Sequence, residues 1–359
     1  MKNCDNLVYI ATHAEEIFLD LIWPDGPTCP CCKGHSYYKM GDCRYKCKDC
    51  GKIYSPKTDT IFHRSHVSLA NWLIALYLML DGKGISSIEL GRKIGVTQKT
   101  AWFMLCKLRF MFDQSDTVLE GEIAMDEVYV GGTWKNFCLK KRQALLSKYK
   151  LPQHPKTVKE KMALAQAVNC RYKSPVFGMN DGEKLVLRVM PNPVVDEDVI
   201  SIFNTHTLNE GWSVSDCSHL YDNWKLMTGY DISHNNHSKG QYVAEDGRSS
   251  NRIEGEFSWV KRGTVFNHVH MSKRLLQLYL NEHAFRFCNR AKSIIEKLRQ
   301  AFQKVRIRFN RDDLKAYNSL SGFPIRQENW FDPWEFFKTY PIREVVRNGV
   351  VYRAEEFCC

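Results

Sequence analysis

Six cysteines lie close together near the N-terminus, between Cys29 and Cys50, and four of them form two spaced pairs. Two residues separate Cys29 from Cys32, and two separate Cys47 from Cys50. A two-residue gap turns the chain so that both sulfur atoms point at one tetrahedral ion. Two such knuckles at this separation are typical of a four-thiolate zinc ribbon. We therefore predict a structural Zn²⁺ at these cysteines, because four thiolates leave no open coordination position.

Three neighbours of these pairs refine the prediction. Gly51 permits the left-handed backbone that such knuckles often need. Cys31 and Cys43 are surplus to a four-ligand site, and Cys31 could replace a neighbour only with a poorer fit to the turn. The alternative is a set of free buried thiols, which the paired spacing does not favour.

The same cysteines would indicate disulfides in a secreted chain, so the compartment matters. The N-terminal residues lack the uninterrupted apolar run and the cleavage site of a signal peptide. The most apolar stretch, Leu69 to Leu80, is too short to span a bilayer and is followed by Asp81. We expect a cytoplasmic protein with no membrane partner and with reduced cysteines that bind metal.

Length and charge point to several domains and a polyanionic partner. A chain of 359 residues is long enough for two or three domains. Its formal net charge is +11, and between Cys29 and Phe112 fourteen Lys and Arg stand against five Asp and Glu. Such an excess favours nucleic acid over a membrane surface here, since no basic amphipathic helix with a lipid-facing side is evident.

A pair of short helices is predicted after the cysteines. We expect one helix over about Ser86 to Ile94, a turn through Gly95 and Val96, and a second helix capped by Thr97. Two helices joined in this way are typical of a helix-turn-helix, whose second helix enters the major groove of DNA. The residues that would face bases or phosphates are Gln98, Lys99 and Thr100. A helical packing domain with a solvated basic face remains the alternative.

The second half of the chain has a different pattern. We expect strands over residues 123–130, 162–169, 174–180, 184–190 and 211–216 and helices over residues 196–206 and from 251 onward. Residues 135–161 form a basic insertion, expected as a surface loop or a short helix. After residue 290 we expect a basic helix and then an aromatic-rich segment, residues 328–340, that either packs as an arm or stacks on DNA bases.

Three carboxylates occupy unusual places in this pattern. Asp126 lies at the centre of a strand, Asp216 at the end of another, and Glu254 on a helix. Acids on distant elements that converge suit a divalent metal site, because Mg²⁺ prefers hard oxygen ligands and two such ions can activate a phosphodiester. Taken singly, each acid could equally be a turn, strand-edge or exposed helix residue.

The order of motifs resembles a known family. The stretches "MDEVYVGG", "SDCSHLY", "NRIEGEFSWVKRGT" and "LYLNEHAFRFCNR" follow the zinc-ribbon and helix-turn-helix patterns in this sequence. From Cys29 to Arg290 the chain resembles insertion-sequence DDE transposases of the ISXO-two-like group, related to Merlin elements. The resemblance implies a ribonuclease H-like mixed sheet flanked by helices, and DNA strand cleavage and transfer with Mg²⁺ or Mn²⁺.

The resemblance also implies roles for single residues. The two metal ions would be held by the catalytic acids Asp126, Asp216 and Glu254. Lys261 shares a helix face with Glu254 and would contact phosphate near the scissile bond. Further contacts to the DNA backbone would come from Arg252 and Arg262.

This chain departs from the family pattern near the third acid. The usual "HTN" is here "SSN", residues 249–251, and Glu256 stands where an apolar residue is usual. Because some members of the group use Asn as the third ligand, Asn251 remains a substitute for Glu254.

Together these inferences predict an α+β multidomain protein. Its expected parts are a helical segment (1–25), a zinc ribbon (26–62), a helix-turn-helix domain (63–113), a ribonuclease H-like DDE domain (118–292) and a tail (293–359). The expected function is a transposase that binds terminal inverted repeats and target DNA as a homodimer or larger synaptic assembly, in the bacterial cytoplasm at the nucleoid. A zinc-dependent DNA-binding regulator with an inert catalytic domain, and a nuclease that cuts without joining, are the alternatives.

Overall fold

The computed structural model describes residues 2–132, 134–192, 194–208, 211–216, 224–235, 243, 247–266, 271–321, 344–347 and 350–353. The chain divides into two compact units. Unit 1 contains residues 1–113 and 281–317, and unit 2 contains residues 114–280 and 318–359. The aromatic-rich segment 328–340 lies outside the described residues.

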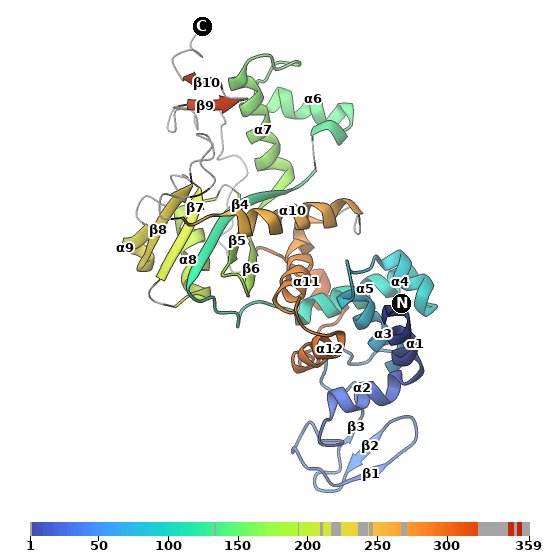
Figure 1. Cartoon of the computed structure of the whole chain (residues 1–359). Coiled ribbons are helices and arrows are strands. Elements are labelled where there is room, and N and C mark those ends of the chain that lie inside the picture. Colours follow the sequence, from blue (N-terminus) through green and yellow to red (C-terminus); the bar gives the residue numbers. More distant parts are fainter. Residues whose placement is uncertain are drawn as a thin grey trace. The chain divides into compact units, whose positions relative to one another are not determined.

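Unit 1 combines a small sheet with helices from both ends of its sequence (Figure 1). Its three-stranded antiparallel sheet has the order β1-β2-β3, with strands β1 (Tyr37–Lys39), β2 (Tyr45–Cys47) and β3 (Ile53–Tyr54). Its helices are α1 (Lys2–Thr12), α2 (Ala14–Ile22), α3 (Leu69–Leu80), α4 (Ser87–Ile94), α5 (Gln98–Met111), α12 (Ile294–Gln303), α13 (Arg311–Ala316) and the later part of α11 (Leu276–Cys288).

Side-chain caps set the ends of α3, α4 and α5. The hydroxyl groups of Ser68, Ser86 and Thr97 each accept a backbone N–H in the first turn of the helix that follows. The predicted helix pair is confirmed: α4 ends at Ile94, and Gly95 adopts the left-handed conformation with φ 68°. Val96 then leads into the Thr97 cap, so the turn between α4 and α5 is short and fixed.

The C-terminal part of unit 1 closes its core. The backbone N–H of Ile61 donates to the carbonyl of Val305 over 2.9 Å. Phe302 of α12 packs edge-on against Phe18 of α2, with ring centroids 5.0 Å apart. Residues after α11 therefore contribute to the folding of the N-terminal unit, although they are remote from it in sequence.

Lys107 of α5 is a buried cation, and we expect its charge to lower the stability of the folded state. Only 4% of it is exposed, its ammonium lies 6.0 Å from the ring of Trp72, and burial lowers its pKa to about 8 against a weaker opposing effect of Asp313. We predict that Lys107→Met stabilises the protein at pH 7 by about 1–2 kcal/mol, because methionine removes the charge and keeps much of the packing.

The pH dependence of this effect has a defined sign. Between pH 8 and 10.5 the folded state loses the Lys107 proton while the unfolded state keeps it, so the wild type gains stability as pH rises. Calorimetry at pH 7 and pH 10 should therefore show that the stability difference between Lys107→Met and the wild type is smaller at pH 10. The exposed Lys93→Met control should show little change at either pH, and an equal gap at both would contradict the assignment.

Unit 2 is built on a five-stranded mixed sheet with the order β6-β5-β4-β7-β8. Its strands are β4 (Glu122–Gly131), β5 (Lys173–Asn180), β6 (Leu185–Val189), β7 (Gly211–Asp216) and β8 (Tyr230–Asn235). β4, β5 and β6 pair antiparallel, whereas β7 pairs parallel with both β4 and β8. The predicted mixed sheet is confirmed, and the long central strand β4 carries Asp126.

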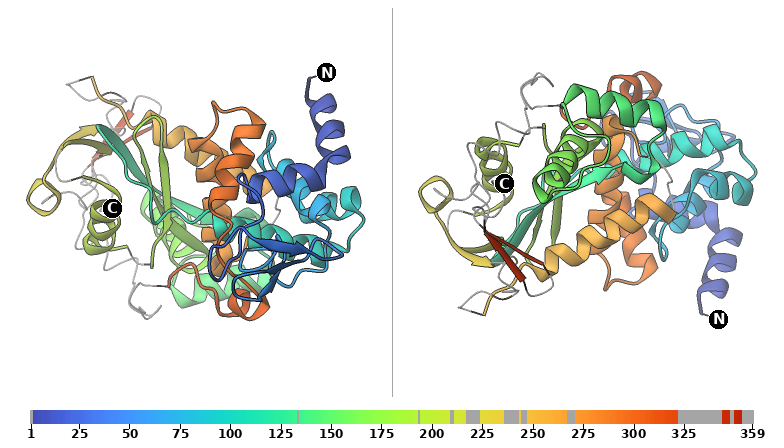
Figure 2. Two further views of the ribbon diagram at one scale, coloured as in Figure 1. Left: turned by 90° about the horizontal axis from the view of Figure 1, so that it is seen from below. Right: turned by 90° about the horizontal axis from the view of Figure 1, so that it is seen from above.

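Helices pack on this sheet. The core that contains Ile123 and Met125 of β4 also contains Val199 of α8 (Asp196–His206) and Trp224 of α9 (Trp224–Thr228). α10 (Asn251–Phe266) lies along β4 and β5 in all three views (Figures 1 and 2). Because side chains alternate across a strand, Asp126 and Met125 face opposite sides of β4.

One predicted strand is wrong. Residues 162–169 belong to α7 (Val158–Tyr172), a helix that begins with a capping box formed by Thr157 and Glu160. The preceding basic segment contains the short helix η1 (Trp134–Asn136) and α6 (Leu139–Lys148). A stretch rich in alanine and leucine has high helix propensity, and the Thr-x-x-Glu start signal fixes its first turn.

The remaining described elements are short. η4 (Lys273–Leu275) precedes α11, and β9 (Glu344–Arg347) pairs antiparallel with β10 (Val350–Arg353). Within the described ranges, every helix is too short or too polar to cross a bilayer.

Candidate functional site

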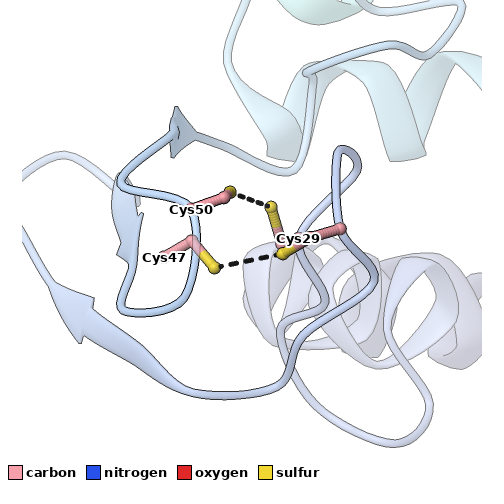
Figure 3. A group of neighbouring side chains, drawn as sticks. Cys29, Cys47 and Cys50 are labelled. Carbon is pink, nitrogen blue, oxygen red and sulfur yellow. Dashed lines mark hydrogen bonds between the residues drawn. The ribbon is translucent and has the colours of Figure 1, made fainter.

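The four predicted zinc ligands meet in one cluster. The sulfur atoms of Cys29, Cys32, Cys47 and Cys50 all lie within 4.8 Å of one another, and Figure 3 shows three of these side chains turned toward a common point. The Sγ atoms are 3.6 Å apart for Cys29 and Cys50, and 3.5 Å apart for Cys32 and Cys47. Thiolates on a tetrahedral Zn²⁺ are about 3.8 Å apart, so the donor set and its spacing fit zinc.

The surroundings favour a thiolate at Cys29 and disfavour one at Cys50. Burial opposes ionisation, yet the backbone N–H groups of Cys32 and Cys31 lower the pKa of the Cys29 thiol to about 7. The backbone at Lys52 acts to lower the pKa of Cys50, but the neighbouring Cys32 and burial outweigh it and raise that pKa to about 12. A divalent cation bound by the four sulfur atoms would stabilise their thiolate forms. Protons compete for the same sulfur atoms, so zinc affinity falls as pH falls.

The knuckles take the conformation that the sequence predicts. Gly51 has φ 72°, the left-handed value expected after the second cysteine pair. Cys31 is exposed and Cys43 is half-buried, and neither belongs to the cluster. Trp23 packs edge-on against Tyr45 of β2 and Tyr54 of β3, and this contact stabilises the small sheet.

The sheet of unit 2 brings two of the predicted acids to one level. Ala124 of β4 pairs with Val214 of β7 in parallel register. Continued by two residues, the same register sets Asp126 beside Asp216, the last residue of β7. The described structure includes the backbone of Asp216 but not its side chain. The two acids therefore stand on neighbouring parallel strands at the same height.

The third acid lies on the helix that covers Asp126's face of the sheet. Asp126 pairs with Gly178 of β5, and directly opposed residues in an antiparallel ladder point to the same face. A Cβ on Gly178 would lie 2.6 Å from a ring carbon of Phe257 and 2.7 Å from Ile253, both on α10. Asp126 therefore faces α10. Glu254 follows Ile253 directly and lies at the edge of the same packed stripe.

A hydrogen-bonded chain orients Glu254. The hydroxyl of Ser250 donates to Oε1 of Glu254 over 3.0 Å, and Nδ2 of Asn235 donates to Oγ of Ser250 over 3.3 Å. Asn235 is fully buried at the end of β8, where it pairs in register with Asp216. The end of β8 therefore pairs with the backbone of Asp216 and also holds the carboxylate of Glu254 through Ser250.

Two arginines hold the start of α10 on the sheet. Glu122, the first residue of β4, accepts a hydrogen bond from Arg252 and forms an ion pair of 3.3 Å with Arg248. Arg248 also stacks over Trp212 at 4.0 Å, and Arg252 reaches the carbonyl of Asp181. Arg252, predicted to contact DNA, is engaged here in positioning α10, while its side chain remains 40% exposed.

The other predicted contact residues lie on exposed helix surfaces. In α5, Gln98 donates to the hydroxyl of Ser87 over 3.1 Å, Lys99 is exposed, and Thr100 hydrogen-bonds the Thr97 cap. In α10, Asn251, Lys261 and Arg262 are exposed, and Glu256 is half-buried. The guanidinium of Arg262 lies 5.0 Å from the Trp259 ring.

The acidic site offers ligands of the type that Mg²⁺ takes. Asp126 and Glu254 come from facing elements, and their carboxylate oxygens are the hard ligands that this ion prefers. Asp126 Oδ1 already accepts the backbone N–H of Glu127 over 2.7 Å, which restrains its rotamer.

Gly178 provides a direct test of the packing that brings Glu254 to Asp126. We predict that Gly178→Ala displaces α10 and destabilises the protein by about 1–3 kcal/mol, because the new methyl group would overlap Phe257 and Ile253. Thermal unfolding of the full chain measures the effect.

A matched control lies on the same helix. Gly255 has open space around its Cβ position, so Gly255→Ala should stabilise α10 by up to about 1 kcal/mol. A Gly178→Ala protein as stable as the wild type would mean that α10 is not fixed on β5 at this point.

Several positioning residues escaped prediction from the sequence. Glu122, Asn235 and Gly178 gain their roles only when the strands are aligned, since each acts on a residue far away in sequence. Ser250 carried a local signal, because a serine four residues before a helix acid can reach its carboxylate.

Comparison with known proteins finds two family models that match parts of the chain. Residues 118–289 match the ISXO2-like transposase domain, and residues 12–53 match the transposase zinc-ribbon domain. Both matches are to transposase domain models, and the resemblance seen in the motifs is confirmed.

One curated relative comes from a transposable element. A Halobacterium salinarum protein, described as an uncharacterized protein in transposable element ISH50, is 26% identical over 278 residues. The aligned part is 76% of this chain and 89% of the relative. No solved structure matches the chain.

Proposed function

We propose that this protein is a DNA transposase that binds the terminal inverted repeats of its element and catalyses metal-dependent strand cleavage and strand transfer. The observation that carries the proposal is the parallel register of β4 and β7, whose continuation by two residues would bring Asp126 level with Asp216 on neighbouring strands, together with the packing of α10, which bears Glu254, on the face of Asp126. The strand order supports a ribonuclease H-like catalytic domain, since three antiparallel strands are followed by two strands parallel to the first.

In this proposal Asp126, Asp216 and Glu254 hold two Mg²⁺ or Mn²⁺ ions. Bound there, the ions would supply Lewis-acid activation of the attacking oxygen and neutralise charge on the leaving oxygen. The protein fixes the carboxylates: Ser250 and Asn235 orient Glu254, and Glu122 holds the start of its helix. Lys261 contacts the phosphate, because it lies seven residues after Glu254 on the same helix side.

Recognition of the element's ends would belong to unit 1. The α4–turn–α5 pair has the form of a helix-turn-helix, and Gln98, Lys99 and Thr100 occupy the first turn of α5, where such helices contact bases. The zinc ribbon precedes it along the chain. Because both ends of an element must meet before strand transfer, we expect a homodimer or a larger synaptic assembly on duplex DNA.

A strand-transfer assay tests the proposal. Purified protein is mixed with labelled terminal-repeat DNA, a target duplex and Mg²⁺, and the products are resolved by length. Cleavage at the repeat ends and joined products are expected. Specific binding without cleavage would identify a regulator and contradict the proposal, and cleavage without joining would identify a nuclease.

A further inference from the structure

The segment between β4 and β5 is a separate helical insert in unit 2. It leaves the sheet after Gly131 and returns at Lys173, and these two residues face each other in the β4–β5 ladder. Figure 1 shows α6 and α7 stacked beyond the end of the sheet at which these strands are joined. We call residues 132–172 the insert.

The insert has a hydrophobic core of its own. The buried side chains of α6 and α7 pack on one another, with Trp134, Phe137, Leu164 and Tyr172 at the edge of the cluster; its buried members are Leu145, Leu146, Tyr149, Leu151, Ala163, Ala167 and Val168. An insert with its own core is a structured element and not a flexible loop. Its surface charges therefore keep a fixed arrangement.

The charge of this insert is strongly one-sided. It contains ten Lys and Arg and one acid, Glu160, in a chain whose formal net charge is +11. The Glu160 carboxylate accepts backbone N–H groups of Lys156 and Thr157, and these hydrogen bonds lower its pKa. The only acid is thus engaged in capping α7.

The lysines are turned outward. All eight are exposed, namely Lys135, Lys140, Lys141, Lys148, Lys150, Lys156, Lys159 and Lys161. Arg142 instead serves the fold, since it donates to the carbonyl of Lys135 and lies over the Trp134 ring. Among the residues that the structure describes, no ion pair joins any of the eight lysines to a carboxylate. Eight like charges on one small element repel one another, and a polyanion would relieve this repulsion.

The insert begins close to the acidic site. Asp126 precedes Gly131 by five residues on one continuous strand, a distance of about 17 Å at the usual rise. One turn of B-DNA is about 34 Å long, so a duplex with a phosphate at Asp126 and its axis along β4 would reach the insert within about half a turn. Lys173, where the insert joins β5, is half-buried. Its pKa is lowered mainly by burial and to a smaller extent by repulsion from Lys261. Positive charge therefore extends from α10 to the insert.

We infer that the insert binds the phosphate backbone of the DNA duplex that flanks the reacting phosphate, through its exposed lysines and without regard to base sequence. Lysine acts as a point charge toward phosphate, and the exposed cations of the insert are all lysines, which lack the fixed donor fork of arginine. The inference rests on the proposed function, because it assigns a second DNA contact to the same catalytic unit.

Salt-dependent binding tests this inference. The full-length variant with Lys140→Gln, Lys141→Gln, Lys148→Gln and Lys159→Gln is titrated with a short duplex of arbitrary sequence, at several salt concentrations and without Mg²⁺. The slope of log affinity against log salt should fall by about 3 to 4, since each lost phosphate contact removes about 0.9. Affinity at low salt should fall at least tenfold.

A matched variant removes the same number of charges elsewhere. It carries Lys225→Gln, Arg299→Gln, Arg311→Gln and Lys315→Gln, all at exposed positions, and it should keep the wild-type slope. Equal slopes for the two variants would overturn the inference. The inference would also be overturned if the four-lysine variant bound the duplex like the wild type but no longer bound poly-glutamate. The insert would then bind an acidic protein and not DNA.

These results can be separated from those of the strand-transfer assay. A wild-type protein that never cuts DNA contradicts the proposed function, whatever the binding slopes are. A protein that cuts and joins DNA while both variants keep the wild-type slope contradicts only the role of the insert. Circular dichroism of both variants checks that α6 and α7 remain folded.

Discussion

Replacing Asp126 by Asn should reduce metal-dependent strand cleavage by about a thousand-fold or more, while the fold remains intact. The substitution keeps the size of the side chain but removes the charge, and a metal ligand of this kind contributes several kcal/mol to transition-state stabilisation. Asp126 is half-buried in the long strand β4, and the Oδ1 that accepts the backbone N–H of Glu127 has a counterpart in the asparagine amide oxygen, so we expect a small stability cost.

The neighbouring acid is the matched control for this substitution. Glu127 carries the same charge on the same strand but faces the opposite side of the sheet, so Glu127→Gln should retain activity within about a few-fold. Single-turnover cleavage of terminal-repeat DNA measures both variants. Equal rates for Asp126→Asn and the wild type would remove Asp126 from the site.

Loss of one zinc ligand should unfold the N-terminal ribbon. Cys47 is 1% exposed and supplies one of four clustered sulfur atoms, so Cys47→Ser should abolish binding of the single Zn²⁺ per chain. Binding of structural zinc contributes about 10–16 kcal/mol of folding free energy in comparable small modules. The ribbon sheet has only three short strands, and besides the metal it has a small aromatic cluster around Tyr45 to stabilise it.

Metal content and hydrogen exchange measure this effect. The amides of β1 to β3 should lose protection, the unit 2 sheet should keep it, and specific affinity for terminal repeats should fall. Cys31→Ser is the matched control, because Cys31 is exposed and stands outside the cluster. A Cys47→Ser protein that retains full zinc and a protected ribbon would contradict four-thiolate coordination.

Local patterns predicted much of the fold. The Thr97 cap and Gly95 define α4 and α5 through contacts within a few residues, so the sequence alone was enough to locate them. The cysteine pairs behave similarly, because each knuckle is a local turn and one ion joins them. Short apolar runs likewise indicated β5 and the strand that ends at Asp216.

Contacts between distant segments could not be predicted in this way. The close approach of α10 to Gly178 depends on how a helix and a strand pack, and no local pattern around residue 178 encodes it. The Asn235–Ser250–Glu254 chain likewise requires β8 to lie beside β7. Helix α7 was predicted as a strand because an apolar and alanine-rich stretch suits either a buried strand or a helix, and only the capping box at Thr157 distinguishes them.

The central claim is that Asp126, Asp216 and Glu254 share a pair of divalent cations. Crystals of the full chain soaked with Mn²⁺ test it directly, because manganese gives an anomalous scattering signal. We expect two peaks bounded by these three residues, with oxygen ligands at about 2.1–2.2 Å. Manganese bound elsewhere, or carboxylates that point to separate surfaces, would contradict the account.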